Sequence, residues 1–185
     1  MKVCAAIILS CLWCWSASAL ANNANTAALP DWLLQIQQQK NIQPEAMLQQ
    51  ALSHEADFGN WNVTQQASWL NELSLIYEAL GRHRDQLAAA ERGLALVPDL
   101  LSKTHVELLF SMGYALEMHR EYAQANEYYK KGMALATELK DEKLMIQGQL
   151  NLAAMLAEES QDQEALETLK QAYDRAVKLG DKEVL

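Results

Sequence analysis

The chain has 185 residues, a formal net charge of −9 and a hydrophobic fraction of 50%. This length suits one domain with a sizeable core. The acidic balance argues against nucleic acid and anionic membranes as partners, because both repel a negatively charged protein. Seven glycines and three prolines are few for this length, which favours an almost wholly helical chain.

The first 21 residues have the pattern of a secretory signal peptide. Lys2 precedes an apolar run over residues 3–15, and small residues lead to a cleavage site after Ala21. An uncleaved anchor is one alternative, although the run is short for a membrane span. A lipid-modified Cys11 is the other. Cleavage remains the favoured interpretation.

All three cysteines, Cys4, Cys11 and Cys14, lie in this segment. The mature chain would therefore form no disulfide, thiolate metal site or cysteine nucleophile. Cleavage would also remove Lys2 and no acidic residue, so the net charge would change from −9 to about −10. We therefore expect an exported protein, in the periplasm of a bacterium.

The mature chain is expected to begin with a flexible leader, residues 22–29, which has no periodicity. A short helix is predicted from Pro30 to about Lys40 and another from Pro44 to about Asp57. Together they would form a degenerate capping hairpin, residues 30–58. Its glutamines would face water, as a terminal repeat requires: Gln35, Gln37, Gln38, Gln39, Gln43, Gln49 and Gln50. A glutamine-rich interaction tract is the alternative.

Residues 59–185 predict three further hairpins, at about 67–100, 106–141 and 146–181. Asn62 and Gln65 form a capping-box pattern for a helix that runs to Leu80. Gly81 suits the end of that helix, and Pro98 stops the helix that follows it. Further helices are predicted at about 102–118, 121–139, 142–158 and 162–179, the last marked by Ser160 and Gln163.

Small and apolar residues recur at intervals of about 40. Five pairs of residues 40 positions apart are identical or similar: Ala125 and Ala165, Gly132 and Ala172, Ala136 and Ala176, Leu139 and Leu179, and Asp141 and Asp181. Towards the N-terminus, the small-residue position moves from Ala125 to Gln86 and then to Ala46. Small residues such as Gly113 let helices approach closely, and Tyr122 and Tyr129 would fill the adjoining spaces. Near-equal steps indicate a repeat protein built from helical hairpins.

These units resemble tetratricopeptide repeats. One unit is carried by Leu73-Ser74, Tyr77, Gly81, Ala90, Gly93 and Pro98, and the next by Met112-Gly113, Tyr122, Ala125, Tyr129 and Gly132. Gln86 stands where the family usually has alanine, and Asp162 where it has an aromatic residue. The resemblance covers residues 67–185 well and residues 31–57 poorly. It implies a right-handed α-α superhelix of about seven to eight helices.

The resemblance also implies a concave groove that binds an extended or helical peptide. The matching positions are Asn71, Leu75, Glu78, Glu107, Phe110, Tyr114, Glu117, Met118, Gln147, Leu150 and Glu158. Apolar side chains beside carboxylates suit an apolar segment carrying lysine or arginine. The set lacks the lysines and arginines with which some members of the family clamp a carboxylate. The alternative is that Leu75, Phe110, Tyr114 and Leu150 pack between hairpins as core.

Candidate sites for chemistry are weak. His54-Glu55 begins like a zinc-protease helix, but Phe58 stands where the second histidine belongs. Residues 83–85 match a kinase triplet only in letters, because Ala90 replaces the required asparagine. We therefore expect a non-catalytic protein without cofactor or metal.

The end of the chain suggests a second interpretation. Residues 181–185 correspond to residues 141–145, which begin a hairpin, so the last apolar face would be left uncovered. The chain would then be the N-terminal sensory region of a longer signalling protein, such as a membrane-bound diguanylate cyclase or histidine kinase, in which such repeats occur. A complete chain, whose last residues pack as a stub, is the alternative.

Overall fold

The computed structural model describes residues 29–180. The predicted signal peptide, nearly all of the leader and the last five residues lie outside this range. Within it the chain forms eight α-helices, one short 3₁₀ helix and no strand. The all-α hairpin fold predicted from the sequence is therefore confirmed.

The helices occur in consecutive pairs with short connections. Their bounds are α2 (Asp31–Gln39), α3 (Pro44–Ser53), η1 (Glu55–Asn60), α4 (Val63–Ala79), α5 (His83–Leu96), α6 (Lys103–Met118), α7 (Tyr122–Leu139), α8 (Glu142–Glu158) and α9 (Asp162–Leu179). Apart from the end of α3, these bounds lie within a few residues of the predicted ones. None of these helices is both long and apolar enough to cross a membrane.

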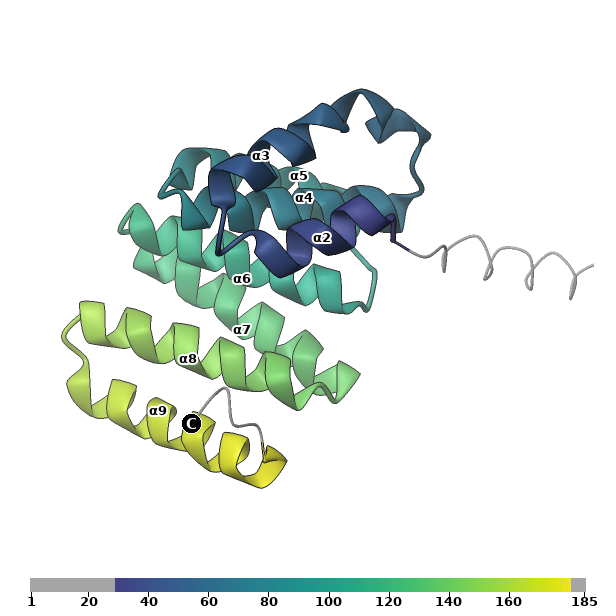
Figure 1. The fold of residues 1–185 in the computed structure, drawn as a ribbon. Coiled ribbons are helices and arrows are strands. Elements are labelled where there is room, and N and C mark those ends of the chain that lie inside the picture. Colours follow the sequence, from purple (N-terminus) through teal and green to yellow (C-terminus); the bar gives the residue numbers. More distant parts are fainter. Residues whose placement is uncertain (1–28, 181–185) are drawn as a thin grey trace, which may run out of the picture.

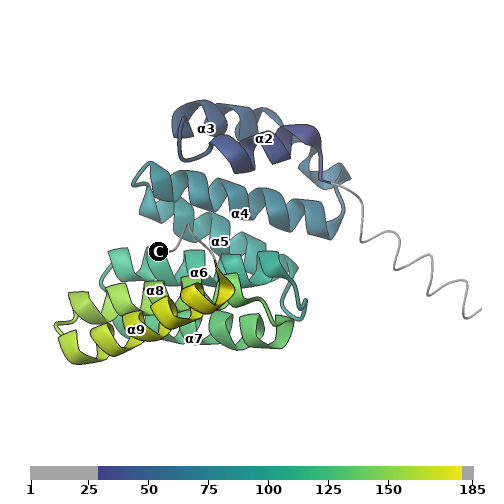
Figure 2. The ribbon, with the colours of Figure 1, turned by 60° about the horizontal axis from the view of Figure 1, so that its bottom comes forward.

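The pairs stack one on the next, with α2 and α9 at opposite ends (Figures 1 and 2). Within each pair the two helices pack closely. The first helices of the pairs, α2, α4, α6 and α8, also contact one another in turn. We call these four helices the inner layer, because their shared face carries the candidate site described below.

The repeat predicted from side-chain spacing also appears in the backbone. Gly81, Arg120 and Ser160 end the first helices of three successive hairpins, and their φ angles are +67°, +63° and +61°. Lys140 and Gly180 end two of the second helices, with φ of +56° and +71°. Each set recurs at intervals of 39 or 40 residues, so the turns have the same period as the helices.

Close contacts between helices occur where glycine replaces a side chain. A Cβ atom added at Gly113 would lie 2.6 Å from the ring of Tyr129, and one at Gly132 would lie 2.4 Å from the ring of Phe110. Gly148 also adjoins Phe110, at 2.8 Å from such a Cβ. Aromatic rings thus fill the spaces beside small residues, as predicted for Tyr129. Phe110 does so as well, between α7 and α8.

The capping box predicted for α4 is confirmed. The start of α9 at Asp162 is also as predicted, but the cap predicted there from Ser160 and Gln163 is wrong. Asn62 Oδ1 accepts a 2.9 Å hydrogen bond from the backbone N–H of Gln65, and Gln65 Oε1 accepts one of 3.2 Å from the backbone N–H of Asn62. By contrast, α9 begins after Gln161, and Ser160 takes a left-handed backbone conformation instead of capping the helix. The repeated turn requires that conformation at the end of α8.

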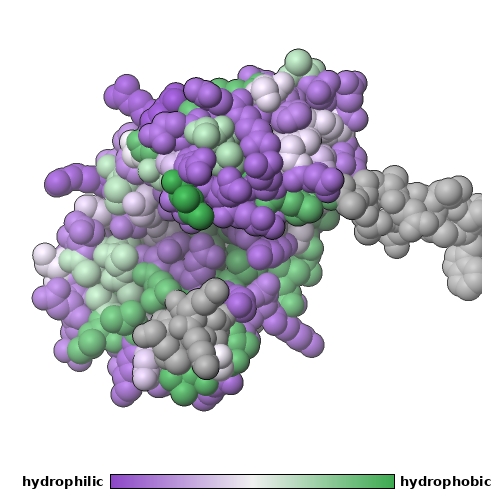
Figure 3. All heavy atoms as spheres, in the orientation of Figure 1, coloured by the Kyte–Doolittle hydropathy of each residue, from purple (hydrophilic) through white to green (hydrophobic). Residues whose placement is uncertain are grey.

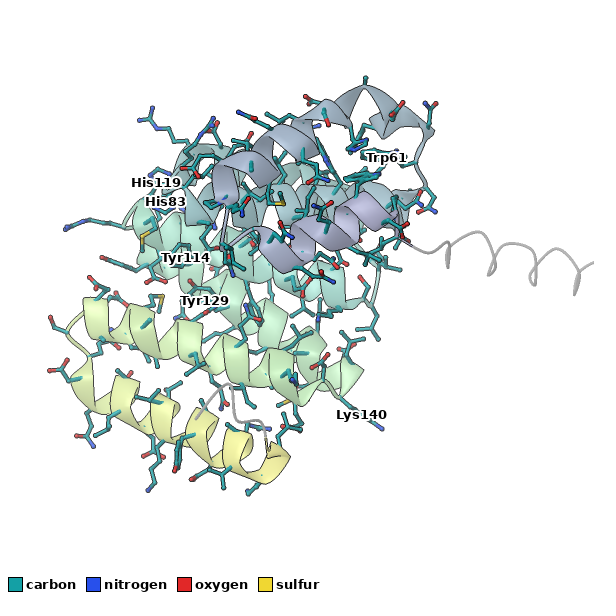
Figure 4. The ribbon with its side chains drawn as sticks, viewed as in Figure 1. Trp61, His83, Tyr114, His119, Tyr129 and Lys140 are labelled. Carbon is teal, nitrogen blue, oxygen red and sulfur yellow. The ribbon has the colours of Figure 1, made fainter. Side chains whose placement is uncertain are left out.

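The helix predicted to reach Asp57 also ends early, at Ser53, and a 3₁₀ turn follows. Trp69 of α4 donates a 3.0 Å hydrogen bond from Nε1 to the carbonyl oxygen of Ala51. Phe58 and Trp61 then turn inward, with ring centroids 5.3 Å and 5.8 Å from that of Trp69. The chain leaves the axis of α3 at this aromatic cluster, in which Figure 4 labels Trp61.

Candidate functional site

The inner layer surrounds a hollow of about 420 Å³. Figure 3 shows it between the N-terminal helices and α8, with hydrophilic residues on its floor. We call it the groove, and the residues that line it are Lys40, Asn41, Leu75, Glu78, Ala79, Glu107, Phe110, Ser111, Tyr114, Gln147 and Asn151. Six of them were among the predicted site residues. All belong to inner-layer helices or follow α2 directly.

The groove is built from equivalent positions of successive hairpins. Three rows cross from α4 to α6 to α8 at intervals of 36 and 40 residues: Asn71, Glu107 and Gln147; Leu75, Ser111 and Asn151; Glu78, Tyr114 and Ala154. Along each helix the rows are four and then three residues apart, which keeps them on one face. The first and third rows are therefore about 10 Å apart along the helix axes.

The first row contains a carboxylate with few partners. Asn71 Nδ2 donates a 3.0 Å hydrogen bond to Glu107 Oε2, and Lys103 Nζ lies 3.5 Å from Glu107 Oε1. The Lys103 side chain is 67% exposed, so water screens this ion pair. Burial raises the pKa of the Glu107 carboxyl above its ordinary value, and Lys103 only partly opposes this rise.

A second carboxylate lies in the third row. Glu78 Oε2 accepts a 2.9 Å hydrogen bond from Gln86 Nε2, and burial raises the pKa of the Glu78 carboxyl. The ring of His83 opposes that rise and lies edge-on to Tyr114, with centroids 5.9 Å apart. His83 and Tyr114 thus meet at one edge of the stack (Figure 4).

Gln86 also explains the departure from the small-residue pattern. Its side chain is fully buried, and its Oε1 lies 3.1 Å from His83 Nδ1. The polar side chain at this position therefore connects α5 with Glu78 on α4.

The groove contains a cation that the sequence did not indicate. Lys40 Nζ lies 2.7 Å from Glu72 Oε2, and Gln37 Nε2 donates a 3.0 Å hydrogen bond to Glu72 Oε1. Lys40 is therefore already paired with a buried carboxylate of α4. Gln37, expected to face water, instead points inward.

Among the described residues, two buried polar atoms beside the groove have no hydrogen-bond partner. They are Asn71 Oδ1 and Ser111 Oγ, and each residue is only 2% exposed. Buried polar atoms are usually paired, and an unpaired one costs about 1–3 kcal/mol. Asn71 and Ser111 both lie beside Glu107. The Asn71 side chain is hydrogen-bonded to Glu107, and Ser111 follows Glu107 by one helical turn in α6.

The remaining predicted residues lie elsewhere. Glu117 is 5% exposed and accepts a 2.7 Å hydrogen bond from the Tyr129 hydroxyl, so it belongs to the core. Phe110 touches the groove but is 2% exposed and packs against glycines, as the core alternative predicted. Met118, Leu150 and Glu158 do not line the groove, and Asn71 lies behind its lining, where it is hydrogen-bonded to Glu107.

A second, apolar hollow of about 450 Å³ lies between α8 and α9. Leu150, Leu166, Leu169 and Tyr173 line it, with Lys170. Tyr173 is 56% and Leu166 is 64% exposed. This face of α9 is the one expected from the sequence to be uncovered, and it carries no polar anchor comparable to those of the groove.

His54 and His105 have packing roles. His54 stacks on Trp32, with ring centroids 4.0 Å apart and planes 13° apart. His105 Nδ1 lies 2.8 Å from the carbonyl oxygen of Leu100 at the start of α6. Residues 29–180 contain no group of three histidine, cysteine, aspartate or glutamate side chains placed to hold a metal ion.

Comparison with known proteins adds no assignment. Neither a protein-family model nor a curated protein sequence matches this chain.

Proposed function

We propose that this protein is an exported, non-catalytic module of the tetratricopeptide type that binds a peptide segment of another protein in its groove. The observation that carries the proposal is the position of the groove. Equivalent positions of three hairpins line one hollow, with partly buried Leu75 and Tyr114 beside carboxylates and amides. Such a mixture of apolar surface and oriented polar groups is typical of recognition sites.

The size of the hollow supports a short segment as the ligand. A volume of about 420 Å³ is that of a small-ligand pocket, so it has room for a few side chains but not for a folded domain. The signal-peptide pattern of residues 1–21 supports the location, and the resemblance to tetratricopeptide repeats supports the class of ligand.

Selection from a random octapeptide display library tests this proposal. We expect enriched peptides to shift the backbone NMR signals of Leu75, Tyr114 and Gln147 in the purified protein. Gln147→Trp would place a bulky side chain at the rim and should weaken binding at least tenfold. Gln163→Trp, on the exposed face of α9, is the matched control and should not.

Two results would refute the proposal. One is that no peptide is enriched above background. The other is that enriched peptides shift the signals of Leu166 and Tyr173 instead, which would place binding on the α9 face.

A further inference from the structure

We propose that the groove has a subsite for a basic side chain of the bound peptide, formed by Glu107, Asn71 and Ser111. This inference rests on the proposed peptide binding and names the chemistry that it requires. The ligand group would be a guanidinium or ammonium group, which donates hydrogen bonds and accepts none.

The subsite has unused hydrogen-bonding capacity. Asn71 Oδ1 and Ser111 Oγ are both buried acceptors without a donor. Glu107 receives one hydrogen bond from Asn71 and a longer contact from an exposed lysine, so its carboxylate retains free lone pairs. A ligand that fits must therefore supply several donors at once, as a planar guanidinium does.

The surroundings of the subsite are negatively charged. Lys40, the one cation among the groove-lining residues, is paired with Glu72. Glu107 and Glu78 thus leave the groove negative. Burial raises the pKa of the Glu107 carboxyl, Glu72 on α4 adds to that rise, and Lys103 opposes it. A bound cation would stabilise the charged form of Glu107.

Within the described part of the chain, the Ser111 hydroxyl makes no hydrogen bond. Ser111 is 2% exposed and belongs to the middle row. The equivalent residue of α4 is Leu75. A leucine or alanine would fill such a position without an unpaired hydroxyl. The Ser111 hydroxyl therefore contributes no hydrogen bond to the fold, and Ser111 also lines the groove.

The experiment uses one defined probe and its uncharged isostere. The probe is a fluorescein-labelled octapeptide in which leucine and serine alternate around one central arginine. The isostere replaces arginine by citrulline, which keeps the shape but not the charge. By fluorescence anisotropy at pH 7.5, we expect the arginine peptide to bind at least tenfold tighter.

Variants then assign the preference to the subsite. Glu107→Gln keeps an acceptor for Asn71 but removes the charge, so it should reduce the arginine-to-citrulline ratio to below about twofold. Ser111→Ala should weaken arginine binding severalfold without lowering the urea midpoint, since no hydrogen bond is lost in the free protein. Glu127→Gln, on the exposed face of α7, is the matched control and should change neither.

The pH dependence gives an independent readout. Protonation of Glu107 removes its attraction for arginine, so affinity for the arginine peptide should fall with falling pH more steeply than affinity for the citrulline peptide. The groups that face Glu107 are Lys103 on its own helix, Glu72 on α4 and Lys40 after α2. Lys103→Gln should leave the steeper fall in place, because that lysine is largely exposed.

The outcomes separate the two proposals. If both peptides bind in the groove equally well, or if Glu107→Gln keeps the tenfold preference, the basic subsite is refuted and peptide binding stands. If neither peptide binds, the subsite and the peptide-binding function fail together. Equally strong binding of free spermidine at Glu107, mapped by NMR, would replace the peptide side chain by a small polyamine as the ligand.

Discussion

Replacing Tyr129 by phenylalanine should remove a buried hydrogen bond with little change in packing. The Tyr129 hydroxyl donates to Glu117 Oε2 over 2.7 Å, and the two residues are 0% and 5% exposed. The phenylalanine ring would keep its place against Gly113. A hydrogen bond to a charged group contributes about 1.5–3 kcal/mol, so we expect the free energy of unfolding to fall by about 2 kcal/mol at neutral pH.

The same substitution should change the response to pH. Burial raises the pKa of the Glu117 carboxyl above its ordinary value, and the hydrogen bond from Tyr129 opposes that rise. Without the hydroxyl, the pKa of Glu117 in the folded protein should rise further. A carboxyl whose pKa is higher in the folded chain takes up a proton on folding, so a lower pH favours the fold.

The sign of this effect can be measured directly. The stability that protonation of Glu117 provides is complete below the ordinary carboxyl pKa and is lost as the pH rises through the raised value. The deficit of Tyr129→Phe relative to the wild type should therefore shrink as the pH falls from about 7 to about 5. Taking this difference cancels the titration of carboxyls that the substitution does not affect.

Urea unfolding followed by circular dichroism at several pH values is the assay. Tyr128→Phe, at the neighbouring and only half-buried position of α7, is the matched control and should change stability by less than about 0.5 kcal/mol. A loss below that value in Tyr129→Phe, or a deficit that does not vary with pH, would show that this hydrogen bond does not stabilise the buried carboxylate.

Three further substitutions test other features by the same unfolding assay. Gly132→Ala would place a Cβ atom 2.4 Å from the Phe110 ring. Overpacking should outweigh the gain in helix propensity and lower the free energy of unfolding by about 1 kcal/mol. If adding Phe110→Leu to this variant recovers none of the loss, the contact with Phe110 is not its cause. Gln86→Ala introduces the residue found at the equivalent positions 125 and 165. It should lower the free energy of unfolding by about 2 kcal/mol, and an NMR titration should show a higher pKa for the Glu78 carboxyl, because a hydrogen bond to Glu78 is lost. Unchanged stability would show that the fold does not need the buried amide. Lys140→Gly should stabilise the protein by about 0.5–1 kcal/mol, because Lys140 has φ of +56°, a conformation that glycine adopts without strain. A loss of stability would mean that backbone strain is not significant at this turn.

The helices could be predicted from the sequence because their signals are local. Apolar residues at a period of 3.6 define each helix, and Gly81 and the pair Asn62 and Gln65 mark ends through contacts within a few residues. The end of α3 could not be predicted in this way. It depends on contacts of Phe58 and Trp61 with Trp69 in the next hairpin.

The site was predicted only in part, for a related reason. An apolar stripe predicts which face of a helix is buried. It does not predict which side of that face packs against other helices and which side lines the groove. Phe110 is buried because glycines at positions 132 and 148, on two other helices, admit its ring. Lys40 was missed because it reaches the groove from the first hairpin, where the repeat pattern is weakest.

The two ends of α6 show how burial of a carboxylate can serve either the fold or a ligand. Burial raises the pKa of both Glu107 and Glu117. Glu117 is compensated within the chain, by a buried tyrosine hydroxyl at 2.7 Å. Glu107 has an amide and an exposed lysine, while two unpaired acceptors, Asn71 Oδ1 and Ser111 Oγ, lie beside it. Packing alone would favour apolar residues at these positions, and this incomplete pairing is the basis of the proposed subsite for a basic side chain.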